Sequence, residues 1–110
     1  MMQERRRYER VPFSADLSVL DLTSGARYQG HSVDLSQGGI GFYCPRFLPV
    51  GSRVRLFIWL TGGGRRRCVA VEAQVRWARA EETGAIMGAE FDCLLNLAHQ
   101  PLLYECLEQN

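Results

Sequence analysis

Residues 53–78 have the sequence RVRLFIWLTGGGRRRCVAVEAQVRWA, and most of the expected architecture follows from them. From Arg53, polar and apolar side chains alternate, and the run becomes nearly all apolar by Leu60, which is typical of a β-strand. In the second half, alternate residues place five side chains on one face: Val69, Val71, Ala73, Val75 and Trp77. Between the halves, residues 62–67 predict a glycine-rich hairpin loop that exposes the triple Arg65–Arg67. The stretch therefore predicts two antiparallel strands.

Strand patterns also occupy the rest of the chain up to its last turn. Further strands are predicted around Ala15–Val19, over 27–35, around 40–44 and over 85–91, and Pro12 suits a strand start or edge. Only the end predicts a helix, over residues 100–108, because Leu102, Leu103, Cys106 and Leu107 form one apolar stripe behind Pro101. Short antiparallel strands followed by one helix predict a mainly β fold, a small β-barrel with a C-terminal α-helix.

Length and composition limit the protein class. A chain of 110 residues is expected to form one domain. No apolar run approaches the roughly 18 residues of a membrane helix, and no apolar segment follows the arginine-rich start as in a signal peptide. We therefore expect a soluble, cytoplasmic protein. The cysteines show no CxxC spacing and are expected to be reduced and mostly core filler, and no metal site is expected from isolated histidines.

The basic residues are all arginine, and their placement is more informative than their number. The formal net charge is only +1, which does not favour a nucleic-acid-binding protein. The first ten residues, however, hold four arginines against two glutamates. Guanidinium groups bind phosphate oxygens in pairs and also match the O6/N7 edge of guanine. A disordered basic terminus is the simpler interpretation of this segment taken alone.

A second motif, Asp34-Leu35-Ser36-Gln37-Gly38-Gly39, follows the predicted strand over 27–35. Asp, Ser and Gly are ordinary turn residues, so a plain turn is one interpretation. In a binding turn, Asp34 would supply acceptors, Ser36 a hydroxyl, and Gly39 room for a bulky ligand to approach the backbone.

Together, Arg6-Arg7-Tyr8-Glu9-Arg10 and the Asp34–Gly39 turn resemble the RxxxR and DxSxxG motifs of the PilZ domain family, the bacterial cyclic-di-GMP receptors. The segment Gly88-Ala89-Glu90-Phe91 also looks like the family's G-x-x-F. The resemblance covers nearly the whole chain. It implies a six-stranded antiparallel barrel over 11–93, an N-terminal arm over 1–10 and a C-terminal helix over 100–108, all in one domain.

The resemblance also implies roles for individual residues. Arg6 and Arg10 would anchor phosphates and guanine faces, and Asp34, Ser36 and Gly39 would contact a guanine base. An arginine directly before RxxxR, here Arg5, is typical of relatives that hold two intercalated ligand molecules. The secondary contacts expected are Arg7, Gly38 and Trp77, although the face that Trp77 shares with Val71 and Val75 favours a core position for it.

These motifs predict a cyclic-di-GMP receptor whose surface changes on ligand binding and which acts in trans on an effector protein. No catalytic residue, cofactor or metal, and no DNA or RNA partner, is expected. A ligand-independent PilZ adaptor is one alternative, and an oligonucleotide-binding small barrel is another.

Overall fold

The computed structural model describes residues 8–108, which form seven strands and one helix. The elements are β1 (Val11–Pro12), β2 (Asp16–Asp21), β3 (Arg27–Leu35), β4 (Gly39–Cys44), β5 (Arg53–Gly62), β6 (Arg65–Glu81), β7 (Gly84–Phe91) and α1 (Pro101–Glu108). Pro12, which has no N–H to donate, lies in the short edge strand β1, as predicted.

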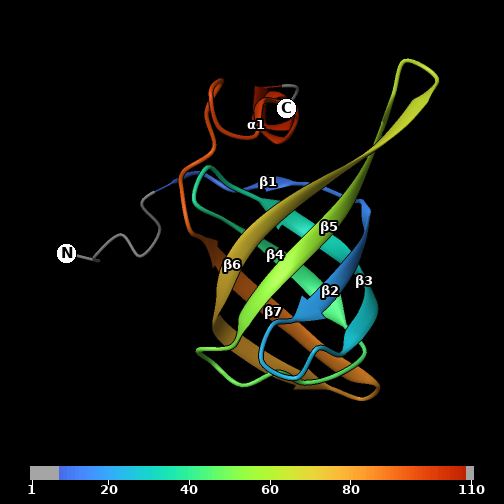
Figure 1. The fold of residues 1–110 in the computed structure, drawn as a ribbon, viewed down its shortest axis with the longest axis vertical. Helices are drawn as coiled ribbons and strands as arrows, with labels where there is room; N and C mark the ends of the chain where they lie inside the picture. Colours follow the sequence, from blue (N-terminus) through green and yellow to red (C-terminus); the bar gives the residue numbers. More distant parts are fainter. Residues whose placement is uncertain (1–7, 109–110) are drawn as a thin grey trace.

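The strands form a closed antiparallel ring. Their order is β1-β3-β2-β5-β6-β7-β4, and an additional pairing between β3 and β4 closes it. The ring has six strands, β2 to β7, and β1 adds to β3 at its edge. Figure 1 shows α1 at one end of the barrel, next to β1. The predicted mainly β fold, a six-stranded antiparallel barrel with one C-terminal helix, is confirmed.

The core fills the barrel with alternate residues of each strand. On β5 the buried side chains are Val54, Leu56 and Ile58, as the period of two predicts. Leu103 of α1 is also fully buried and belongs to the same cluster. Burial of such apolar area is the main favourable term in folding, so the inward face of each strand fixes its register.

The hairpin between β5 and β6 differs from its prediction. Residues 62–67 are not a loop: the turn is only Gly63-Gly64, and Arg65, Arg66 and Arg67 pair with Gly62, Thr61 and Leu60 in the ladder. Both turn glycines have positive φ, +57° and +75°, which a two-residue type I′ turn needs at both positions. The hairpin consequently continues as a two-stranded ribbon beyond the barrel (Figure 1).

The predicted apolar face of β6 also ends earlier than expected. A β-bulge lies between Val75 and Trp77, where Val75 pairs with Ala89 but Trp77 pairs with the next residue back, Gly88. Val75 is fully buried, whereas Trp77 is 42% exposed and the half-buried Ala78 packs against the core instead. A bulge shifts the inward alternation by one residue, so Trp77 is a surface residue and not a core residue.

The four cysteines are reduced thiols, but only Cys44 is fully buried, and Cys68 and Cys93 are exposed. The expectation that they mostly fill the core was therefore wrong. Burial raises the pKa of the Cys44 thiol and keeps it protonated.

None of the helices among residues 8–108 has the length and apolar character needed to cross a membrane.

Candidate functional site

The two sequence motifs meet at the start of β1. Because Pro12 pairs with Asp34 across β1 and β3, Arg10 lies just outside the barrel and within reach of the Asp34 carboxylate. Arg10 Nη1 donates to Asp34 Oδ1 at 2.9 Å, and the two side chains are 21% and 31% exposed. Residues 24 positions apart in sequence thus form a partly buried ion pair at the predicted site.

A neighbouring glycine lets the Asp34 carboxylate lie flat on the sheet. Gly41 pairs with Asp34 across β3 and β4, and its N–H donates to Asp34 Oδ1 at 3.0 Å. A Cβ at Gly41 would come within 2.6 Å of the same oxygen. The sequence analysis did not identify Gly41, because its position opposite Asp34 depends on the pairing of β3 with β4.

The Ser36 hydroxyl is engaged within its own turn. Its Oγ accepts from the N–H groups of Gly38 at 3.2 Å and Gly39 at 3.1 Å, and donates to Gly39 O at 3.4 Å. The residue is buried. Ser36 therefore fixes the shape of the turn, and the N–H groups of Gly38 and Gly39 point to its hydroxyl.

Gly39 is required by a neighbouring strand, and Gly38 lies close to the ring of Tyr8. A Cβ on Gly39 would lie 2.5 Å from the Ala89 carbonyl oxygen, because β4 and β7 approach closely here. A Cβ on Gly38 would lie 3.0 Å from the ring of Tyr8. The reason expected for Gly39, access of a bulky ligand to the backbone, is thus accompanied by a packing reason within the barrel.

A cavity of about 500 Å³ lies between the arm, the turn and the strands β6 and β7. We call it the Arg10 cavity, and its wall includes Tyr8, Arg10, Ser36, Gly39, Trp77 and Gly88. Gly38 also lines it, whereas Asp34 is not in the wall and is joined to it through its ion pair with Arg10. Of the predicted site residues that the structure describes, five line one cavity together with Tyr8: Arg10, Ser36, Gly38, Gly39 and Trp77.

The Trp77 indole lies directly over Gly88. A Cβ on Gly88 would overlap the indole Nε1, so only glycine allows the ring to lie this close to β7. The bulge turns the ring outward, and the glycine below it holds the ring flat against the strand. Gly88 begins the segment that resembles G-x-x-F, and Phe91 at its end is buried in the core.

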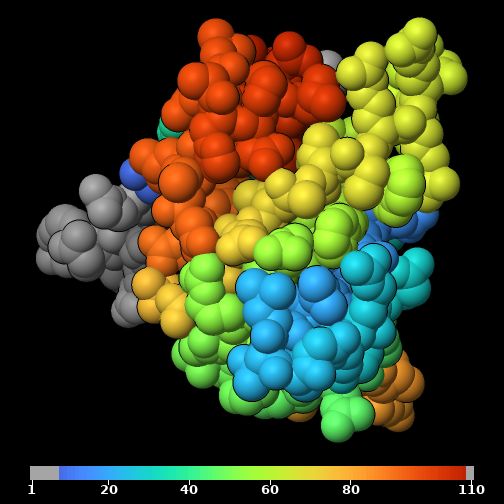
Figure 2. All heavy atoms as spheres, in the orientation of Figure 1, coloured from blue at the N-terminus to red at the C-terminus, as the bar shows by residue number. Residues whose placement is uncertain are grey.

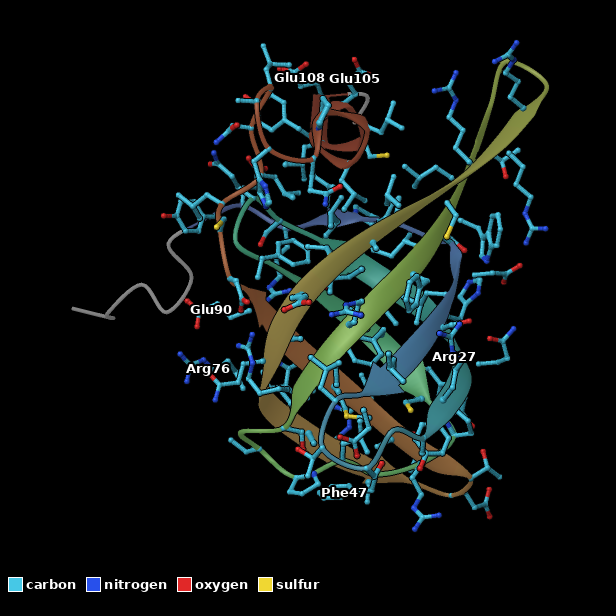
Figure 3. All side chains as sticks on the ribbon, viewed as in Figure 1. Arg27, Phe47, Arg76, Glu90, Glu105 and Glu108 are labelled. Atoms are coloured by element: carbon cyan, nitrogen blue, oxygen red, sulfur yellow. The ribbon has the colours of Figure 1, made fainter. Side chains whose placement is uncertain are left out.

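Two acidic residues of the cavity wall are held by arginines. Arg76 Nε donates to Glu90 Oε1 at 2.7 Å, as the facing side chains in Figure 3 show. Arg53 donates two hydrogen bonds to the Asp92 carboxylate, at 2.9 and 2.6 Å, which lowers the pKa of Asp92. The sequence analysis did not identify these pairs, because their partners are far apart in the chain. Both pairs neutralise negative charge that would repel an anionic ligand.

Three predicted site residues, Arg5, Arg6 and Arg7, lie outside the described residues. No group of three or more His, Cys, Asp or Glu side chains within residues 8–108 is arranged to hold a metal ion.

The structure does contain a nucleophile–base arrangement, which the sequence did not indicate. Ser14 Oγ lies 2.7 Å from His31 Nε2, and His31 Nδ1 lies 3.3 Å from Asp16 Oδ1. The side chains of His31 and Asp16 are 51% and 70% exposed, so water solvates both, unlike the water-excluded sites in which such rows act catalytically. Here these contacts link Ser14, which precedes β2, and Asp16, the first residue of β2, to His31 of β3.

Comparisons with known proteins identify the family and the fold of this chain. The family model described as PilZ domain matches residues 4–109. Comparison with curated protein sequences gave no significant match.

Solved structures have the same fold. The Bacillus subtilis inhibitor of motility (MotI/DgrA) aligns with a TM-score of 0.75 and 23% identity, over 97% of this chain and 52% of that chain. This chain thus spans about half the length of that relative. The PilZ domain with c-di-GMP of YcgR from Escherichia coli aligns with a TM-score of 0.65 and 18% identity, over 96% of this chain and 94% of that chain. Because the family model matches nearly the whole of this chain, the chain belongs to the PilZ domain family.

Proposed function

We propose that this chain is a cyclic-di-GMP receptor that binds its ligand in the Arg10 cavity and signals to a partner protein. The observation that carries the proposal is the Arg10–Asp34 ion pair at a cavity of about 500 Å³ that Ser36 and Gly39 also line. Cavities of roughly 300–1,000 Å³ are usual for small-molecule sites. Two solved structures of the same fold from Escherichia coli are complexes with c-di-GMP, which supports the choice of ligand.

The phosphate contacts are assigned to arginines. The guanidinium of Arg10 has several N–H donors, and Nη1 donates a hydrogen bond to Asp34. The remaining donors are available for phosphate oxygens, while Asp34 keeps the group oriented. By the family's motif, Arg6 is the second anchor, and Arg5 and Arg7 add positive charge from the arm.

The guanine contacts are assigned to the turn and to the facing strand. Because the Ser36 hydroxyl is engaged within the turn, its contribution is to hold the backbone of Gly38 and Gly39 in place for the base. Arg10 and Gly41 both donate to Oδ1 of Asp34, so its other carboxylate oxygen accepts from guanine N–H groups. Trp77, exposed and flat over Gly88, offers a ring on which a base stacks.

Ligand binding would then order the N-terminal arm over the cavity. In the described end of the arm, Arg10 is attached to Asp34, and the Tyr8 ring lies close to Gly38. A ligand between the arm arginines and the turn would extend this attachment toward residue 5, which creates a new surface for an effector. We place this signalling in the cytoplasm, where the reduced state of the four cysteines is maintained.

The test is titration calorimetry with cyclic-di-GMP. Because charge-assisted hydrogen bonds contribute about 1.5–3 kcal/mol each, Arg6→Ala or Arg10→Ala should weaken binding roughly ten- to a few-hundred-fold. The triple Arg65→Gln, Arg66→Gln, Arg67→Gln is the matched control and should bind like the wild type. Wild-type affinity in both arm variants would contradict the site.

A double variant separates contact from orientation. Arg10→Ala leaves the Asp34 carboxylate unpaired at the cavity, and this charge alone could repel the ligand. We therefore expect Asp34→Ala to weaken binding less than Arg10→Ala, and the double variant Arg10→Ala/Asp34→Ala to remain weak. Recovery of affinity in the double variant would show that Arg10 only neutralises Asp34.

The same titration gives the number of ligands. We expect two cyclic-di-GMP molecules per chain, because an extra guanidinium at Arg5 helps to neutralise the four phosphate charges of an intercalated pair. Replacing Arg5 by Leu should reduce the stoichiometry to one. An unchanged stoichiometry of two in Arg5→Leu would remove this role from Arg5.

Two other functions give different results. A ligand-independent adaptor would show no heat with cyclic-di-GMP, and an oligonucleotide-binding barrel would bind random single strands at physiological salt with no response to cyclic-di-GMP. The Arg10–Asp34 pair at a formed cavity favours the nucleotide receptor over both.

A further inference from the structure

The ribbon formed by residues 59–72 of β5 and β6 extends past its neighbouring strands. We call it the hairpin extension. On one side, β2 stops pairing with β5 at Ile58, and on the other, β7 stops pairing with β6 at Ala73. Figure 2 shows the extension, in yellow, standing out from the barrel beside α1. This leaves a strand edge outside the closed ring, the feature that barrels otherwise remove.

Part of the β6 edge is already covered. Gln100 Nε2 donates to the Ala70 carbonyl at 2.7 Å, and Asp92 N donates to the Glu72 carbonyl at 3.0 Å. The carbonyls of Ala70 and Glu72 therefore point away from β5, toward the outer edge of β6. Since the outward direction repeats every second residue in an antiparallel pair, the N–H and C=O groups of Arg66 and Cys68 also face the edge.

Within residues 8–108, this second part of the edge is exposed over residues 65–68. No backbone hydrogen bond outside the β5–β6 ladder joins Arg66 or Cys68 to another described residue. The opposite edge is less open, because the segment before β2 lies beside it: Phe13 and Ser14 line a cavity together with Trp59 of β5. The edge of β6 over residues 65–69 is therefore the accessible one.

The charges on this edge select what can pair with it. Arg65, Arg66 and Arg67 are exposed, and none forms an ion pair with another residue of the described part of the chain. Arg65 and Arg67 lie on one face of the ribbon, while Arg66 lies on the other, 4.3 Å above the Trp59 ring. A second copy of this edge would bring three arginines against three, and like charges directly opposite are destabilising.

We infer that the β6 edge over residues 65–69 binds an extended acidic segment of a partner protein by strand addition. The incoming backbone pairs with the outward groups of Arg66 and Cys68. Its acidic side chains, two residues apart, lie beside Arg65 and Arg67, and the intervening apolar side chains lie on the face of Trp59 and Cys68. The inference is independent of the proposed nucleotide function.

Cys68 allows a test that separates pairing from charge. Its N–H faces the open edge and not β5, so Cys68→Pro removes the outward donor and leaves the β5–β6 ladder intact. Cys68→Ala is the matched control with the donor retained. Arg65→Gln/Arg67→Gln removes the charges and leaves the backbone unchanged. Far-UV circular dichroism and the thermal midpoint establish that each variant is folded.

The probe is a short fluorescein-labelled peptide with alternating valine and glutamate, measured by fluorescence anisotropy without nucleotide. We expect the wild type and Cys68→Ala to bind it, and Cys68→Pro and Arg65→Gln/Arg67→Gln each to bind about tenfold more weakly or worse. The amides of Arg66 and Cys68 should exchange with solvent more slowly when the peptide is bound.

Four results would overturn the inference. They are no binding at about 1 mM peptide, wild-type affinity in Cys68→Pro, equal affinity for the same peptide with lysine in place of glutamate, and displacement of the peptide by a single-stranded oligonucleotide. Self-association of the wild type that Cys68→Pro abolishes would make a second copy the occupant and would overturn it as well. Because no nucleotide is present, failure here does not depend on cyclic-di-GMP binding.

Discussion

At the scale of single residues, the site depends on glycines that are required by different neighbours. Gly39 makes room for the Ala89 carbonyl, Gly41 for the Asp34 carboxylate and Gly88 for the Trp77 indole. None of the three has positive φ, so each is required for space and not for backbone conformation. The wall of the Arg10 cavity is therefore set by close approaches between strands.

Replacing Gly88 by alanine should displace Trp77. The added Cβ overlaps the indole Nε1, and the ring, attached to an exposed bulge, is free to swing into water. In a Trp59→Phe background we expect the fluorescence emission of Trp77 to shift to longer wavelength and to be quenched faster by acrylamide. Gly62→Ala, where nothing lies within 4 Å of the new Cβ, is the control. Unchanged emission in Gly88→Ala would mean that the ring does not rest on this glycine.

The residues of the site divide by how they could be found from sequence. Asp34, Ser36 and Arg10 belong to motifs that are continuous or closely spaced in the chain, and the resemblance was sufficient to propose them. Gly41 and Glu90 act through partners on other strands, Asp34 and Arg76, and a single sequence does not state which strands are adjacent. Their roles required the pairing of β4 with β3 and of β6 with β7.

At the scale of elements, the hairpin extension combines a tight turn with a long ribbon. The type I′ geometry at Gly63-Gly64 matches the right-handed twist of the flanking strands, and this is why the ladder continues to its tip. The predicted loop over 62–67 was wrong because three consecutive glycines allow several turns, and arginines are as compatible with an exposed strand as with a loop. The pairing of these arginines with Gly62, Thr61 and Leu60 shows that they belong to a strand.

Gly64→Ala should loosen the extension. At φ of +75° a Cβ costs about 1–2 kcal/mol, so amide exchange in the ladder near the tip should accelerate roughly tenfold. Leu60 and Arg67, which pair in that ladder, are the residues to follow by NMR. Gly62→Ala, one position outside the turn and without positive φ, should leave their exchange unchanged. Equal exchange in both variants would contradict the turn assignment.

At the scale of the whole molecule, ion pairs join strands that are far apart in sequence. The Arg53–Asp92 pair joins the start of β5 to the segment after β7 across 39 positions, and Arg53 lies 3.8 Å from Glu72 of β6 as well. This group ties one end of the barrel together from outside the core.

The pair should make stability depend on acid pH. The hydrogen bonds from Arg53 lower the pKa of Asp92 in the folded state below that of the unfolded chain, about 3.9 for Asp. The contribution is therefore present above the unfolded pKa and is lost as the pH falls through the folded pKa. Thermal midpoints measured from about pH 6 to pH 2 should fall less steeply in Asp92→Asn than in the wild type. Parallel curves would show that the pair does not contribute.

The overall architecture was the most predictable feature. Alternation along β2, β3 and β5 indicates which faces are buried, and burial fixes the barrel; the helix follows from one apolar stripe. The bulge after Val75 could not be predicted, because the period of two continues through Trp77 in the sequence and only the pairing with Gly88 breaks it.

That bulge has a consequence for how such a barrel can change over generations. Arg76 and Trp77 both face outward at the cavity, and neither takes part in filling the core. Substitutions at these two positions can alter which ligand the wall accepts while the inward face of β6 keeps its residues and its register. The bulge therefore lets the protein acquire new binding preferences with little effect on its ability to fold.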